Sequence, residues 1–305
     1  MKKYQYIAVS IIGLLLTTNV QAGLENNPPS GKPSLYTLPA PSRAIEFNAA
    51  ETNDVGATSD FQQALLAARQ GNVNAQIAVA QAYLSGQGTT VNDKQALRWF
   101  GLAAQNGNMD AIVYIGDMYR LGKGIPQNYD EALSRYKTAA DAGNPLGQFN
   151  LHRMYFNGYG VLMDKGIALY WLHRAAAGGL ARAQTRLGKM YKAGMFVNRN
   201  LKRSVKWFRL AAEQGDVEAQ FQLAKLYAMG IGVEKDYLQS YVWLQIVIED
   251  CQYGAQKQQC MDYLASVAST LTPEQIKLAQ QLINRKKQHI AAAEADSPLR
   301  TSISW

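Results

Sequence analysis

The sequence predicts an all-α solenoid of about five 36-residue helix-turn-helix repeats, with capping helices at both ends. Three residue types recur with this period. The tyrosines are Tyr83, Tyr119, Tyr155, Tyr191 and Tyr227. The glycines are Gly86, Gly122, Gly158, Gly194 and Gly230, and the tryptophans, interrupted once by Arg135, are Trp99, Trp171, Trp207 and Trp243. A unit this short has too little core of its own, so it buries its apolar face on its neighbours.

Residues 1–22 are typical of a secretory signal peptide. Lys2 and Lys3 precede an apolar stretch from Ile7 to Leu16, and Val20-Gln21-Ala22 resembles a cleavage site. We therefore expect a periplasmic or secreted protein with no stable membrane anchor after cleavage. Residues 23–57 are rich in proline, and this composition predicts a flexible leader.

Each repeat is expected to form two helices around a glycine turn. In the second repeat Ala111, Ile115, Met118 and Tyr119 fall on one helical stripe, and Gly122 ends that helix. A short polar residue that can cap the second helix follows in every repeat. These predicted caps are Asn92, Asn128, Asp164, Asn200 and Asp236.

The solenoid is expected to span residues 58–290. Residues 58–62 open a helix that matches the second half of a repeat, so the array begins with a half repeat. Thr272 and Pro273 open a final helix that would cover the end of the core. Residues 291–305 are predicted to be an unstructured tail.

The repeated motif resembles the Sel1-like repeat, a relative of the tetratricopeptide repeat. It reads Ala-x-x-x-Leu-Gly-x-x-Tyr-x-x-Gly-x-Gly-Val, then Trp, an Ala-Ala pair and a closing Gly, and residues 182–232 match it best. The resemblance implies a right-handed superhelix that holds other proteins, with the first helices on its concave side. Three positions depart from the motif, at Arg135, His152 and Phe196.

Composition does not name a partner. The net charge of +8 falls to +6 once Lys2 and Lys3 are removed, and no nucleic-acid motif is present, so nucleic acid is not expected as a partner. Cys251 and Cys260 could form a disulfide between the last repeat and the cap, or could be two buried thiols.

No catalytic constellation is evident, and no enzymatic activity, cofactor or metal is expected. The chain has three histidines, of which His173 falls on a face expected to be solvated and His289 lies in a basic stretch. His152 occupies a position that holds a small residue in the other repeats, and we interpret it as a packing residue or, alternatively, as a functional one.

The positions that vary between repeats indicate a binding surface on the first helices. Positive and amide side chains there suit an acidic peptide or a terminal carboxylate, although a solvated basic face without a ligand is also possible. The candidate partner-binding residues are Tyr114, Asp117, Asn150, Arg153, Asn157, Arg186, Lys189, Gln222 and Lys225.

The leading hypothesis is an exported, non-enzymatic adaptor that binds a peptide or an envelope or host protein in the concave groove. A structural component of an envelope machine is an alternative. A β-lactamase-like or cell-wall-acting protein is the third, but Sel1-like proteins of that kind carry a cysteine pair in every repeat, whereas this chain has one pair in total.

Overall fold

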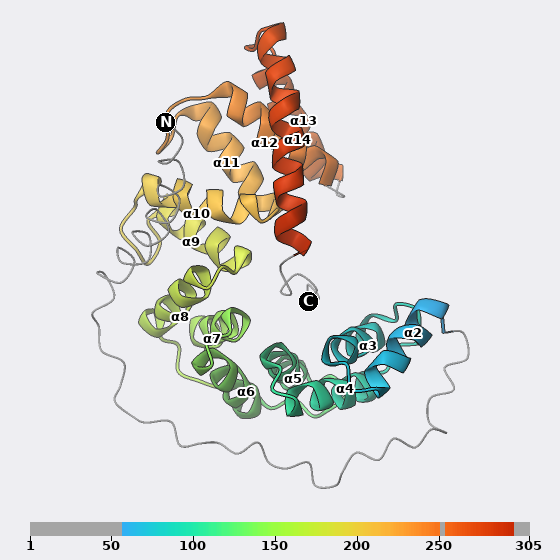
Figure 1. The fold of residues 1–305 in the computed structure, drawn as a ribbon. Coiled ribbons are helices and arrows are strands. Elements are labelled where there is room, and N and C mark those ends of the chain that lie inside the picture. The colour runs from blue at the N-terminus through green and yellow to red at the C-terminus, as the bar shows by residue number, and fades with distance from the viewer. Residues whose placement is uncertain (1–56, 251–253, 296–305) are drawn as a thin grey trace, which may run out of the picture. The chain divides into compact units, whose positions relative to one another are not determined.

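The fold is built from helices alone in the part of the chain that the computed structural model describes, residues 57–250 and 254–295 (Figure 1). The predicted signal peptide, nearly all of the leader, Cys251 and the end of the tail lie outside these residues. The described helices are α2 (Ser59–Arg69), α3 (Val73–Ser85), α4 (Asp93–Gln105), α5 (Met109–Leu121), α6 (Tyr129–Asp141), α7 (Pro145–Asn157), α8 (Lys165–Ala177), α9 (Ala181–Ala193), α10 (Leu201–Glu213), α11 (Val217–Met229), α12 (Tyr237–Asp250), α13 (Gly254–Ala268) and α14 (Pro273–Ala295).

Each repeat is one antiparallel helix pair, as the sequence predicts. The pairs are α3–α4, α5–α6, α7–α8, α9–α10 and α11–α12, and each second helix also packs against the first helix of the next repeat. The half repeat α2 packs on α3, and α14 packs on α12. The prediction of an all-α solenoid is therefore confirmed. None of the described helices is both long and apolar enough to cross a membrane.

The loop inside each repeat is closed by the backbone. Gly86 and its equivalents end the first helices in the left-handed conformation, with φ between 66° and 74°, where a Cβ would cost energy. The predicted capping residue then caps the second helix with its side chain, and its own N–H donates to the carbonyl of the repeat's tyrosine. In the first repeat this bond runs from Asn92 to Tyr83 over 2.8 Å. All five repeats have it, and it holds the two helices of each pair together at their loop end.

Neighbouring repeats are joined by buried glutamines as well as by apolar contacts. Gln148 lies on α7 and donates through Nε2 to the carbonyl of Ala140 on the preceding helix, at 3.3 Å. Gln76, Gln184 and Gln220 make the same bond in their repeats. Ile112 occupies this position in the second repeat and cannot make the bond.

The departures from the motif are accommodated without breaking the array. Phe196 takes a φ of 61°, the same left-handed conformation as the glycines it replaces. Arg135, in place of a tryptophan, is mostly buried and pairs with Glu131 at 3.3 Å. The final helix begins where predicted, since Thr272 and Gln275 exchange two capping hydrogen bonds. It runs to Ala295 and so continues past residue 290, where the prediction placed the start of the tail.

Within a repeat the two helices approach each other where a small residue faces a large one. A Cβ added to Gly188 would lie 2.7 Å from the ring of Phe208, and one added to Gly116 would lie 2.7 Å from the ring of Tyr136. The equivalent positions in the third repeat hold His152 and Leu172, so a larger first residue is matched by a smaller second one. The combined volume of the pair is what the packing limits.

We predict that Gly188→Ala lowers the free energy of unfolding by about 1–3 kcal/mol, because the added methyl group overlaps the ring of Phe208. In the double variant Gly188→Ala/Phe208→Leu the loss should be about 1 kcal/mol smaller than the sum of the two single losses. Denaturant titrations of the four proteins measure this coupling.

The matched control is Gly101→Ala, at a helical glycine with no neighbouring atom within 4 Å. It should raise stability by about 0.5–1 kcal/mol, because alanine favours the helix more than glycine does. Additive losses at Gly188 and Phe208 would contradict the packing account.

Candidate functional site

The variable positions on the first helices lie in register along α3, α5, α7, α9 and α11, but the structure gives them different environments. Gln81 donates to the hydroxyl group of Tyr114 at 2.9 Å, which links the first two repeats. Tyr114 is only 5% exposed and stacks on Phe100 with ring centroids 4.7 Å apart. The expectation that Tyr114 faces solvent is therefore wrong, because it fills the junction between neighbouring first helices.

Asp117 belongs to a polar cluster rather than to an open surface. It accepts hydrogen bonds from the Tyr136 hydroxyl group at 2.8 Å and from Arg120 at 3.1 Å. Burial, and then the charge of Asp117, raise the pKa of Tyr136 well above its ordinary value. Burial lowers the pKa of the Arg120 guanidinium. Its interactions with Tyr136 and Asp117 together outweigh burial, so the pKa is raised. These interactions hold the carboxylate inside its own repeat.

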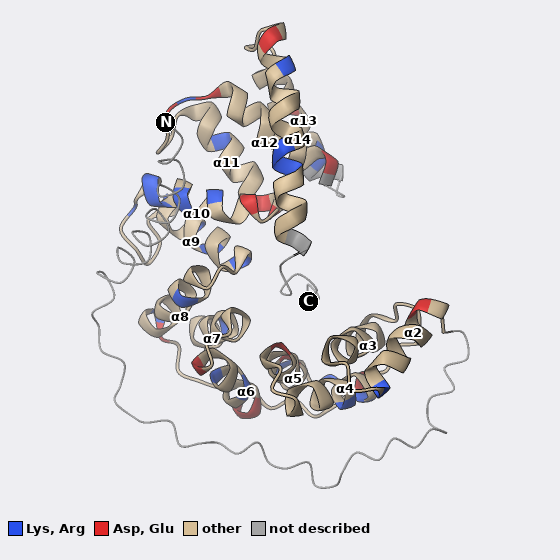
Figure 2. Cartoon of the chain, in the orientation of Figure 1, with Lys and Arg blue, Asp and Glu red and all other residues tan. Residues whose placement is uncertain are grey.

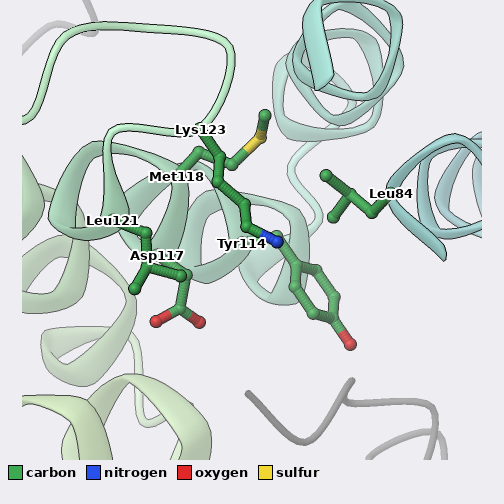
Figure 3. Close-up of a pocket in the computed structure, with 6 residues that line it drawn as sticks. All are labelled: Leu84, Tyr114, Asp117, Met118, Leu121 and Lys123. Carbon is green, nitrogen blue, oxygen red and sulfur yellow. The ribbon is translucent and has the colours of Figure 1, made fainter. Parts of the chain in front are cut away.

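A small pocket lies beside this cluster, between the ends of α3 and α5 (Figure 3). Its space accommodates about one water molecule, far less than an organic ligand needs. We therefore do not assign it a ligand. Its lining residues are Leu84, Tyr114, Asp117, Met118, Leu121 and Lys123.

The middle repeats bring arginines together over aromatic rings. Arg186 lies over the ring of Phe156 at 4.8 Å, and Arg182 lies over Phe149 at 5.8 Å. Burial, and then the charge of Arg153, lower the pKa of Arg186. Arg153 donates to Asn150 at 3.3 Å, but Asn150 itself is 3% exposed, so the expectation that it is a surface residue is also wrong.

The later repeats carry lysines that pair across neighbouring helices. Lys189 forms an exposed ion pair with Glu218 at 2.5 Å, and Lys192 donates to Gln222 at 2.8 Å. Lys225 lies 5.2 Å from each of two rings, those of Phe221 and Tyr263. Burial, and then the charge of Lys225, lower the pKa of Lys192.

We call the accessible part of this surface the first-helix face. The structure brings its cations close to one another and leaves Asn157 exposed beside them, and Figure 2 shows Lys and Arg along α9. Sequence reasoning missed Arg182 and Lys192, although each lies about one helical turn from a predicted residue. The members of the face are Arg153, Asn157, Arg182, Arg186, Lys189, Lys192, Gln222 and Lys225.

Comparison with protein families identifies the repeats. The Sel1 repeat matches residues 73–108, 110–144, 145–180, 181–216 and 217–246, which together make up more than half of the chain. The chain belongs to the Sel1 repeat family. The predicted resemblance and the number of repeats are thereby confirmed. No curated protein is significantly similar to the sequence.

Solved structures of Sel1 repeat proteins resemble this one. A Sel1 repeat protein from Oxalobacter formigenes is 32% identical with a TM-score of 0.59, and the match covers 67% of this chain and 58% of that one. A protective antigen with an SLR fold from uropathogenic Escherichia coli is 25% identical with a TM-score of 0.44, covering 80% and 60%. An immunity protein from Pseudomonas aeruginosa is 21% identical with a TM-score of 0.45, covering 73% and 83%. This chain thus spans less than two thirds of the Oxalobacter protein.

His152 is the most buried departure from the Sel1 motif. It is 0% exposed, lies between Phe149 and Phe156, and its Nδ1 is 2.9 Å from the carbonyl oxygen of Ala168. Nδ1 must therefore donate, and the buried Nε2 has no hydrogen-bond partner. These contacts favour the packing interpretation of His152.

His173 is not on a solvated face as expected. Its ring is half-buried between the rings of Tyr191 and Trp207, at centroid distances of 6.1 and 6.5 Å. Burial, and then the charge of Arg203, lower its pKa.

We predict that His152 makes the fold sensitive to acid. Burial, despite the bond to Ala168, lowers its pKa to about 4. The unfolded chain takes up the proton near pH 6.5, so a fall in pH favours unfolding from about 6.5 down to about 4. The loss should reach about 3 kcal/mol near and below pH 4. His152→Gln can still donate to the carbonyl and should remove this part of the pH dependence.

Free energies of unfolding at several pH values between about 7 and 4 measure the effect. The lowered pKa of His173 also makes the fold less stable as the pH falls. The variant His173→Gln therefore measures this second contribution separately. An unchanged slope in His152→Gln would show that His152 takes up its proton equally in both states.

Proposed function

We propose that this Sel1 repeat protein is an exported adaptor that holds an acidic segment of another protein on its first-helix face. Sel1 repeat proteins generally bind other proteins. The predicted signal peptide at residues 1–22 supports a periplasmic or secreted location.

The observation that carries the proposal is the proximity of like charges from adjacent repeats. Burial, and then the charge of Arg153, lower the pKa of Arg186; burial, and then the charge of Lys225, lower the pKa of Lys192. Repulsion of this kind costs free energy in the unbound protein. An anionic ligand between the cations would relieve it, so the face favours acidic partners.

The surrounding side chains suit an extended peptide. The aromatic rings beneath Arg186 and Lys225 restrict these long side chains, which reduces the entropy lost when a ligand is bound. The amides of Asn157 and Gln222 can bond to a ligand backbone, while arginines can bind carboxylates through two parallel hydrogen bonds. Glu218 already pairs with Lys189 and would be displaced by a stronger acidic ligand.

We predict that the double charge reversal Lys189→Glu/Lys225→Glu weakens capture of the partner by about tenfold or more, since two attractive charges become repulsive. The measurement is affinity capture from cell-envelope extracts, followed by binding of the identified partner. Both lysines are partly exposed, so stability should change by only about 0.5 kcal/mol each.

The matched control is Lys94→Glu/Lys137→Glu, which changes the net charge equally at two exposed positions on the second helices α4 and α6. It should leave capture unchanged. If both variants lose capture of the partner equally, binding depends on overall charge. If both retain capture equally, the first-helix face is not the binding site.

A further inference from the structure

A second surface lies at the loops inside the third and fourth repeats, where apolar side chains point into solvent. Leu162 is 93% and Met163 60% exposed in the α7–α8 loop, and Met195 is 49% and Phe196 41% exposed in the α9–α10 loop. The positions equivalent to Leu162 hold Thr90, Pro126, Asn198 and Glu234. This apolar character is therefore specific to one loop and is not required by the repeat.

Phe196 of the α9–α10 loop contacts helix residues on both sides of the α7–α8 loop, Phe156 at the end of α7 and Lys165 at the start of α8, which brings the exposed side chains of the two loops toward one surface. The ring of Phe196 meets the ring of Phe156 edge-on at 5.6 Å, and the Lys165 ammonium group lies 4.9 Å from the centre of the Phe196 ring. We call Leu162, Met163, Lys165, Met195 and Phe196 the loop patch.

Phe196 is held in a conformation that an aromatic residue rarely adopts. Among the described residues it is the one non-glycine residue with a positive φ, and its counterparts are Gly88, Gly124, Gly160 and Gly232. Strain of this kind persists where the surrounding structure enforces it, and it is frequent at functional sites. Glycine would relieve the strain, so the phenylalanine ring must contribute something in return: it packs against Phe156 and Lys165, and 41% of the residue remains exposed for a contact outside the fold.

The segment that follows Met163 is strongly basic, with Asp164, the N-cap of α8, as an acidic residue beside the loop patch. No Asp or Glu occurs between Asp164 and Glu213, whereas this stretch contains Lys165, Arg174, Arg182, Arg186, Lys189, Lys192, Arg199, Lys202, Arg203, Lys206 and Arg209. Figure 2 shows only basic charge along α9.

Some of these cations stand where they oppose their own helix. Lys165 lies in the first turn of α8, and Lys202 and Arg203 lie in the first turn of α10, where the helix dipole disfavours positive charge. The first turns of α2, α4 and α6 carry acids instead. Helix stability therefore does not explain these cations. Lys165 contacts the ring of Phe196, and attraction to an anionic surface would further offset the unfavourable position of the charges.

We infer that the loop patch docks on an anionic phospholipid surface, with Leu162, Met163, Met195 and Phe196 entering the headgroup region and Lys165 and Lys202 contacting lipid phosphates. Apolar side chains on protruding loops flanked by lysine and arginine fit a membrane interface, where both kinds of group are stabilised. A protein partner would instead favour anchors that fill a pocket. This docking is independent of the proposed function of the first-helix face.

The test is co-sedimentation of the protein, purified in the form that cells produce, with two kinds of vesicle. One contains phosphatidylglycerol and phosphatidylcholine, and the other contains phosphatidylcholine alone. We expect binding to the anionic vesicles, weaker binding to the neutral ones, and release at high salt, which screens lysine–phosphate attraction. The variants Phe196→Gly and Leu162→Ser/Met163→Ser should each weaken binding by about tenfold.

Phe196→Gly keeps the proposal falsifiable, because glycine adopts the same backbone conformation in four other repeats and the variant should fold at least as stably. Val91→Ser is the matched control: Val91 is the counterpart of Met163 in the first repeat, is 63% exposed, and should bind like the unmodified chain.

Three results would overturn the inference: no binding to either vesicle, equal binding to both, or binding that the loop-patch variants do not change. If vesicles fail to bind but immobilised polyglutamate captures the chain and loses it with the same variants, the patch binds an acidic protein and the membrane assignment is wrong.

Discussion

The structure depends on each repeat burying its second helix under the first helix of the next repeat. Buried apolar residues of neighbouring repeats belong to shared clusters, so contacts between neighbours stabilise the array together with the contacts inside each pair. Buried glutamines such as Gln148 add a hydrogen bond at these junctions. Within each pair, a backbone bond from the capping residue to the tyrosine carbonyl closes the loop in the same way in all five repeats. Where the two helices of a pair approach each other, the largest change in side-chain size on the first helix, His152, coincides with a smaller facing residue, Leu172.

This architecture separates positions that carry the fold from positions that can vary. Backbone hydrogen bonds, caps and the small-to-large pairs occupy a minority of each repeat, and the remaining surface can change charge without unfolding the array. The fourth repeat uses this freedom most. It has no acidic residue before Glu213, carries many cations on α9 and α10, and has Phe196 in place of a turn glycine. The first-helix face and the loop patch meet at the ring of Phe156, which both Arg186 and Phe196 contact.

The candidate site was predicted less well than the fold. Repeat register places the candidate residues at equivalent points on the first helices, because the same turn and cap recur in each repeat. It did not reveal that Tyr114 and Asn150 are buried, since burial there depends on how close the next first helix approaches. Nor did it show that Asp117 is held by Arg120 and Tyr136, because Tyr136 comes from the other helix of the pair. Arg182 and Lys192 were missed because selection by repeat position ignored residues one turn away.

The sequence by itself determined the number of repeats, the helix boundaries at caps and glycines, and the cap at each end. These features depend on local backbone chemistry that recurs every 36 residues, so a period reveals them. The tertiary structure alone decided which variable side chains stay accessible, which cations repel one another, and that Phe196 meets Phe156 and Lys165. These outcomes depend on distances between helices of different repeats, and such distances arise from packing that no single repeat encodes.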